Sequence, residues 1–142
     1  MIAAIESHQK ALIAANAALE KHAQDLIVMD VRALSSVTDF FILATAATYR
    51  QSVAIAEWVD HELTRCGGSV LHIEGLVASR PARRRRASAS SSGITAVGLD
   101  GFSWVLVDCG DLVVHLFTPP AREFYQLERL WADAPRIPVA SA

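Results

Sequence analysis

The strongest constraint on the fold is one largely apolar run near the C-terminal end, WVLVDCGDLVVHLF at residues 104–117. Two apolar segments separated by a two-residue loop that ends in glycine predict a tight β-hairpin. With Cys109 and Gly110 as the loop, Asp108 faces Asp111 and Trp104 faces His115 across the two strands. The same run therefore fixes two antiparallel strands and gathers two aspartates, a histidine and a tryptophan.

Side chains alternate along a strand, so this hairpin has two different faces. One face is purely aliphatic and is expected on the core; it consists of Val105, Val107, Leu112, Val114 and Leu116. The other face carries Trp104, Leu106, Val113, His115 and Phe117, with Asp108 and Asp111 near the turn. Tryptophan is enriched at binding hot spots, so this second face suits a partner if it is exposed. The alternative is that another layer of the protein covers it, and the sequence leaves both open.

The rest of the chain predicts an α/β protein with one mixed sheet. Apolar residues that recur with a helical period predict helices at 2–21, 50–66 and, after the hairpin, 121–131. Short apolar runs predict strands at 25–32, 39–47 and 69–75. Helices and strands do not alternate strictly along the chain, which favours a single domain whose five-stranded sheet carries helices mainly on one face. Residues 136–142 are expected to form a frayed tail. No apolar run is long enough to span a membrane, so a cytoplasmic location is expected.

An arginine-rich segment interrupts this pattern at residues 78–101. Its composition cannot bury enough apolar surface to offset the entropy of ordering, so we expect it to be disordered. Five of the 13 basic residues lie in it, and without these five arginines the chain has 8 basic against 15 acidic residues; they are Arg80, Arg83, Arg84, Arg85 and Arg86. They suit contact with RNA through counterion release, and an inert solvated loop is the alternative. The run RRRRASAS also resembles a kinase substrate with Ser88 or Ser90 as the acceptor.

Catalytic and metal-binding interpretations of the chain are weaker. Asp108 and Asp111 would suit an acid–base pair or a metal site, but two carboxylates flanking a tight turn are more typical of solvated turn residues. A lone His115 on an apolar strand is more typical of a packed or interface residue. The chain has no GxxxxGK[ST] phosphate loop, and its two cysteines, Cys66 and Cys109, form no CxxC pair and are expected to be reduced thiols. We therefore predict no enzyme activity, no cofactor and no metal.

Several motifs in one order resemble the ribosomal silencing factor family, also called the Iojap family. They are DVRALSSVTDFFILATA at 30–46, YRQSVAIAEWV at 49–59, the hairpin run at 104–117 and REFYQLERLW at 122–131. The resemblance assigns residues 1–135 to one such domain, interrupted by the segment at 78–101. It implies a fold similar to that of nucleotidyltransferases without transferase activity. The sequence agrees, since the Gly-Ser start and the DxD pair of a transferase are missing.

The resemblance also implies a function. Members bind a basic ribosomal protein on the intersubunit face of the large ribosomal subunit and sterically block joining of the small subunit, which represses translation when nutrients are limiting. By this resemblance Trp104 and its strand neighbours contact the partner. Taken with the polar residues of the hairpin, the predicted partner-binding residues are Trp104, Val105, Leu106, Asp108, Asp111 and His115. Two further possibilities stay open: a large-subunit assembly factor that contacts ribosomal RNA through its arginines, and a homodimer formed by the free protein through its apolar face.

Overall fold

A computed structural model of the chain describes residues 6–75 and 102–139. The arginine-rich segment, the start of the first predicted helix and the last three residues lie outside these ranges, so the expectation of disorder at 78–101 is not addressed. The described elements are α1 (Ser7–Glu20), β1 (Gln24–Asp30), β2 (Phe40–Thr45), α2 (Tyr49–Arg65), β3 (His72–Glu74), β4 (Trp104–Asp108), β5 (Leu112–Phe117), α5 (Pro119–Tyr125), α6 (Leu127–Leu130) and β6 (Arg136–Ile137).

The strands form one mixed sheet in the order β3-β4-β5-β2-β1-β6. All neighbouring pairs are antiparallel except β2 and β5, which run parallel from Phe40 beside Leu112 to Thr45 beside Phe117. The prediction of an α/β domain with a mixed sheet is confirmed. The sheet has six strands rather than five, because Arg136 and Ile137 pair with Met29 and Val28 of β1 where a frayed tail was expected. The edge of β1 supplies the backbone partners that hold this part of the tail.

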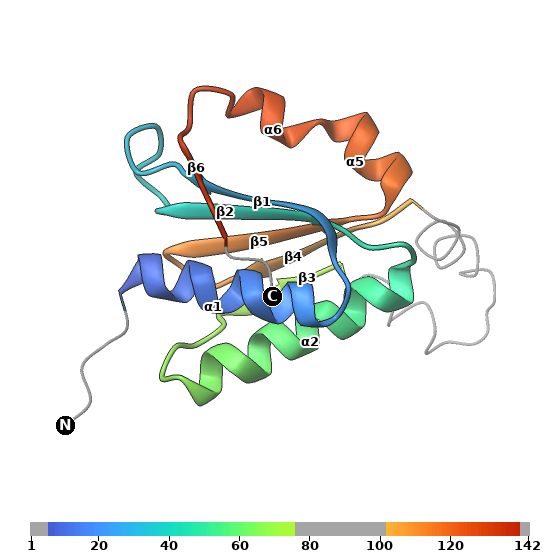
Figure 1. Cartoon of the computed structure of the whole chain (residues 1–142), viewed down its shortest axis with the longest axis horizontal. Coiled ribbons are helices and arrows are strands. Elements are labelled where there is room, and N and C mark those ends of the chain that lie inside the picture. The colour runs from blue at the N-terminus through green and yellow to red at the C-terminus, as the bar shows by residue number, and fades with distance from the viewer. Residues whose placement is uncertain (1–5, 76–101, 140–142) are drawn as a thin grey trace.

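The two longer helices, α1 and α2, cover one face of the sheet (Figure 1). The buried side of α1 is made of alanines at positions 11, 14, 15, 17 and 18, whose small side chains let the helix lie close to its neighbours. The start of α2 is fixed by Thr48, whose hydroxyl oxygen accepts a hydrogen bond from the backbone N–H of Gln51 at 3.1 Å. The aliphatic hairpin face lies in this core, since Val105, Val107, Leu112, Val114 and Leu116 are all fully buried.

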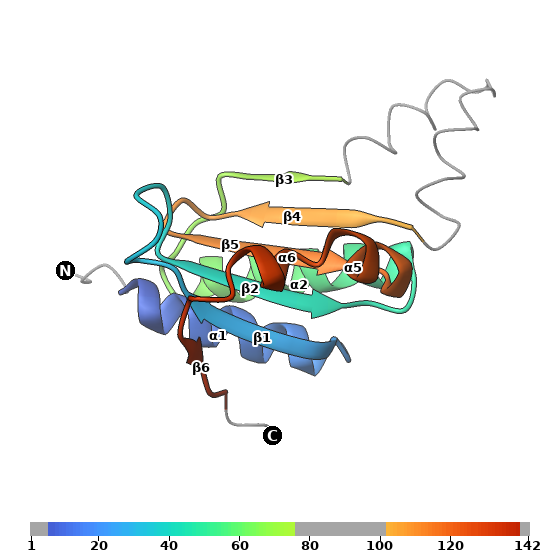
Figure 2. The same ribbon diagram turned by 90° about the horizontal axis from the view of Figure 1, so that it is seen from above.

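The short helices α5 and α6 lie on the opposite face of the sheet (Figure 1). A second core cluster forms there from residues such as Met29, Leu43 and Phe117, with Leu127 and Trp131 of the C-terminal part packed against it. The sequence predicted a single helix through this region, but Gln126 adopts a left-handed conformation with φ 45° and divides it. Seen from this side, α5 and α6 lie over the middle of the sheet and leave β3 and β4 uncovered (Figure 2).

The predicted register of the hairpin is wrong by two residues. Trp104 pairs with Phe117, Leu106 with His115 and Asp108 with Val113. The backbone N–H of Cys109 then donates to the carbonyl of Leu112 at 2.8 Å, so the turn residues are Gly110 and Asp111. Gly110 has φ +87°, a conformation that glycine adopts without strain. Because a shift of two residues preserves the alternation, the predicted division of the hairpin into two faces is confirmed.

Candidate partner-binding surface

The uncovered part of the sheet is a narrow strip built on β3 and β4. Burial alternates along β4, where Val105 and Val107 are buried while Trp104, Leu106 and Asp108 are partly exposed. On β3, His72 pairs with Asp108 and Glu74 pairs with Leu106, so these side chains share the same face. We call these five residues the β3–β4 strip: Trp104, Leu106, Asp108, His72 and Glu74. It combines an apolar centre with carboxylates at its rim.

Trp104 is held in one place at the inner border of the strip. Its indole Nε1–H donates to Nδ1 of His115 at 3.1 Å. Its ring lies 5.1 Å from that of Phe117, its cross-strand partner, and 4.6 Å from that of Tyr125 at the end of α5. An anchor side chain that is ordered before binding loses less conformational entropy when a partner arrives. Trp104 therefore has the geometry of a preorganised hydrophobic anchor.

His115 was predicted to contact a partner, but the structure places it beneath Trp104. It is 5% exposed and lies in edge contact with the ring of Phe41 at 4.9 Å. Burial lowers the pKa of His115 to about 4, so the imidazole is neutral at physiological pH. Since Nδ1 accepts from Trp104, Nε2 carries the proton, and it finds no hydrogen-bond partner among the described residues. His115 positions the anchor and is not available to another molecule.

Val105 and the two aspartates also differ from the prediction in what they contact. Val105 is fully buried on the helix-covered face, so its side chain is not part of the surface. Asp111 forms an ion pair with Lys10 of α1 at 3.2 Å. Asp108 accepts a hydrogen bond from the backbone N–H of Gly110 at 2.9 Å and lies 3.9 Å from Nε2 of His72. Of the two aspartates, only Asp108 contributes a carboxylate to the strip.

The sequence analysis missed His72 and Glu74. Their side chains are exposed, and Nε2 of His72 lies 2.9 Å from a carboxylate oxygen of Glu74. The alternation of polar and apolar residues in the run HIE was a usable signal. The pairing of β3 with β4 was not, because a long intervening segment separates Gly75 from Trp104. The proposed arginine contacts at 80 and 83–86 lie outside the described residues.

Metal sites, membrane-spanning helices and cysteines bear on other possible functions of the described part of the chain. No group of three or more His, Cys, Asp or Glu side chains there is arranged to hold a metal ion. The same residues include no helix that is both long and apolar enough to cross a membrane. Both cysteines are free thiols. The Cys109 thiol has its pKa raised to about 12, chiefly by burial, so it is a poor nucleophile at neutral pH.

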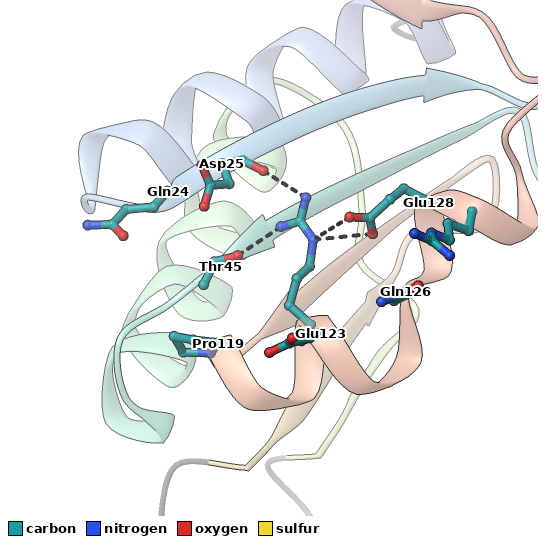
Figure 3. A pocket seen from close by; sticks show the side chains of 9 residues that line it. Gln24, Asp25, Thr45, Pro119, Glu123, Gln126 and Glu128 are labelled. Atoms are coloured by element: carbon teal, nitrogen blue, oxygen red, sulfur yellow. Dashed lines mark hydrogen bonds and ion pairs between the residues drawn. The ribbon is translucent and has the colours of Figure 1, made fainter.

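A polar cavity of about 510 Å³ opens beside the ends of β1 and β2, and Arg122 is one of the residues that line it (Figure 3). The guanidinium of Arg122 donates to both carboxylate oxygens of Glu128, at 3.2 and 3.3 Å, to the hydroxyl of Thr45 at 2.8 Å and to the carbonyl of Asp25 at 3.0 Å. These contacts tie α5 and α6 to the sheet. The arrangement is that of a structural clamp.

The fold and the strip thus define a small α/β domain whose most distinctive exposed feature is a sheet surface suited to contact with another macromolecule. The family model described as "Ribosomal silencing factor during starvation" matches residues 4–142. The chain belongs to this family.

Relatives support the same assignment. The ribosomal silencing factor RsfS of Bacillus subtilis is 33% identical over 123 residues, which cover 87% of this chain and 85% of the relative. A crystal structure of a protein from Chromobacterium violaceum superposes with a TM-score of 0.70 at 28% identity, covering 97% of this chain and 95% of the other. The mouse protein named "Mitochondrial assembly of ribosomal large subunit protein 1" is 26% identical over 79% of this chain. The matched part covers only 40% of the mouse protein.

Proposed function

We propose that this chain binds the large ribosomal subunit through a basic ribosomal protein on its intersubunit face and sterically blocks joining of the small subunit. The β3–β4 strip is the contact surface, and repression of translation during nutrient limitation in the cytoplasm is the outcome. The observation that carries this proposal is the preorganised Trp104 at the border of a sheet surface that none of the described helices covers. Membership of the silencing factor family supports the ribosome as the target.

The chemistry of the strip fits a basic protein. Leu106 offers apolar area within the strip and the ring of Trp104 continues it at the inner border, while Glu74 and Asp108 place negative charge at the rim. Complementary charge speeds encounter and fixes orientation, whereas a buried aromatic anchor supplies most of the affinity. Blocking a subunit interface needs only binding in the right place and steric bulk, so no reacting group is required.

Removal of the anchor tests the proposal. Trp104→Ala should lower the affinity for large subunits by about 30- to 1,000-fold, which corresponds to ~2–4 kcal/mol for a central tryptophan. Co-sedimentation with purified large subunits and a subunit-joining assay measure the two parts of the function. Trp58→Ala is the matched control, because Trp58 lies on α2 at the opposite face and donates to Glu20 at 2.8 Å. Binding of Trp104→Ala at the wild-type level, with the variant folded, would refute the assigned surface.

The two aspartates provide a second, charge-specific test. Asp108→Asn removes a carboxylate from the strip and should weaken large-subunit binding, most clearly at low salt. Asp111→Asn removes the same charge from the chain but acts at the contact with Lys10 on the other side of the hairpin. It should leave binding unchanged and lower the free energy of unfolding by ~0.5–1 kcal/mol. Equal effects on binding would show that only net charge matters.

A contact with ribosomal RNA is a second proposal, favoured by where the arginine-rich segment is attached. The described residues that flank it lie near Trp104: a Cβ built on Gly75 would lie 2.8 Å from the carbonyl oxygen of Trp104, and Phe102 and Trp104 pack against the same hydrophobic cluster. A role in large-subunit assembly, for which the mouse relative is named, would use the same contact. Deletion of residues 80–92 should then reduce the salt dependence of binding by up to ~3–4 in the log–log slope, since five arginines are lost. An unchanged slope would refute RNA contact.

Self-association of the free protein through the same strip also stays a prediction. A dimer of this kind would hide Trp104 and compete with ribosome binding. Sedimentation equilibrium of the wild type and of Trp104→Ala measures it directly. A dimer whose dissociation constant does not change in the variant would place any self-association elsewhere.

A further inference from the structure

A cluster of aromatic side chains adjoins the β3–β4 strip on the side of α5. Phe124 lies with its ring 5.7 Å from that of Phe102 and 5.1 Å from that of Tyr125, and Tyr125 in turn contacts Trp104 at 4.6 Å. Phe, Trp and Tyr make up only 7% of the chain, yet four of them are in mutual contact here. We call Phe102, Phe124 and Tyr125 the aromatic ledge. It continues the apolar surface of Trp104 away from the strands.

The ledge is exposed to a degree that packing within the protein does not explain. Phe124 is 71% exposed and Tyr125 is 38% exposed. A large aromatic ring left in water gains little from folding, so its contribution to the stability of the domain is small. Single exposed apolar residues are common, but a contiguous group that extends the proposed contact surface marks an interaction site.

The backbone shows why Phe124 points outward. In one continuous helix through residues 121–131, Phe124 would share a face with Leu127 and Trp131, both of which pack against the sheet. The left-handed conformation of Gln126 breaks this helix, so that Phe124 lies in α5 and Leu127 in α6. The conformation is unfavourable for a residue with a Cβ atom, and it leaves an aromatic ring exposed. Unfavourable backbone conformations and exposed apolar side chains of this kind occur mainly at functional sites.

We infer that the aromatic ledge is part of the docking surface for the basic ribosomal protein and receives an apolar segment of that partner beside the anchor Trp104. The inference rests on the proposed function and names a second half of the same surface. Continuity with Trp104 through Tyr125 supports this occupant. Charge supports it too, since an exposed acidic residue, Glu123, directly precedes Phe124 in the chain.

Phe124→Ala tests the inference, with Leu130→Ala as the matched control. Leu130 is a similarly exposed apolar residue, at 75%, on the neighbouring α6, and it takes no part in the ring contacts of the ledge. Phe124→Ala should weaken binding to purified large subunits at least tenfold, with the thermal unfolding midpoint within about 2 °C of the wild type. Leu130→Ala should bind within about twofold of the wild type.

Three results would overturn the inference. If Phe124→Ala binds like the wild type while Trp104→Ala does not, the ledge is not part of the surface and the proposed function stands. If Phe124→Ala and Leu130→Ala weaken binding equally, the effect reflects general surface hydrophobicity and not this ledge. If the wild-type chain fails to bind large subunits at all, the proposed function fails and the inference fails with it.

Discussion

Arg122 is the residue whose loss should most directly uncouple the C-terminal helices from the sheet. Its side chain is only 11% exposed, and each of its three nitrogens has a partner: Nε bonds Glu128, one terminal nitrogen bonds Thr45 and the other bonds the carbonyl of Asp25 (Figure 3). Asp25 is itself in a left-handed conformation with φ 49°. One side chain from α5 thus joins α6 and the ends of two strands.

The magnitude follows from what Arg122→Ala would leave behind. Breaking a buried ion pair by removing one partner costs ~3–5 kcal/mol when the remaining charge is fully buried. The Glu128 side chain is 25% exposed and the cavity of about 510 Å³ beside it admits water, so its carboxylate can be rehydrated. That lowers the cost of the lost ion pair to ~1–2 kcal/mol, and the unpaired Thr45 and Asp25 oxygens add ~1 kcal/mol. We expect the free energy of unfolding to fall by ~2–3 kcal/mol.

Urea unfolding followed by circular dichroism measures this loss, and two further variants define its cause. Arg122→Lys keeps the charge but cannot reach three acceptors at once, so it should lose more than half as much stability as Arg122→Ala. Arg129→Ala removes an exposed arginine that lines the same cavity and should change stability by less than ~0.5 kcal/mol. A loss below ~1 kcal/mol for Arg122→Ala, or equal losses for the alanine variants of Arg122 and Arg129, would refute the assignment of a structural clamp.

Two other predictions concern buried titratable groups. Because burial lowers the pKa of His115 to about 4 while the unfolded chain titrates near ~6.5, the unfolded state binds the proton more tightly. The free energy of unfolding should therefore fall as pH drops from ~6.5 to about 4, by up to ~3 kcal/mol, and urea titrations of His115→Phe should lack this component. Because burial raises the pKa of Cys109 to about 12, Ellman's reagent at pH 8 should modify one thiol per native chain, the partly exposed Cys66, and two after unfolding; two thiols reacting rapidly in the native state would contradict this.

The sequence predicted the division of the hairpin into faces but not its register, and the reason is physical. Alternation has a period of two, so moving the turn by one residue shifts every cross-strand pair by two positions and returns each side chain to the same face. Leu112 and Val114 therefore lie in the core as expected, although their partners are Cys109 and Val107 and not Val107 and Val105. Burial patterns are predicted more reliably than contacts for this reason.

Other features depended on contacts between distant segments, and no local pattern encoded them. The left-handed break at Gln126 leaves no signal in a run whose periodicity favours a continuous helix; near it, Arg122 bonds Thr45 and Asp25, which are distant in the sequence. The pairing of Arg136 and Ile137 with β1 requires the edge of the sheet to be free at that point. Secondary-structure propensity predicts the local conformation poorly where tertiary contacts of this kind decide it.

The residues that most resembled an active site in the sequence are also positioned by contacts that no local pattern predicts. Asp108, Asp111 and His115 lie within eight positions of one another, yet the hairpin sends them in three directions. Asp111 reaches Lys10 on the helical side, Asp108 stays with its own turn beside His72, and His115 lies under Trp104 with its pKa lowered by burial. An acid–base set needs its members within hydrogen-bonding reach of one substrate, and these contacts hold the three apart. Trp104 stays partly exposed at the surface, and its hydrogen bond to His115 fixes the indole in place.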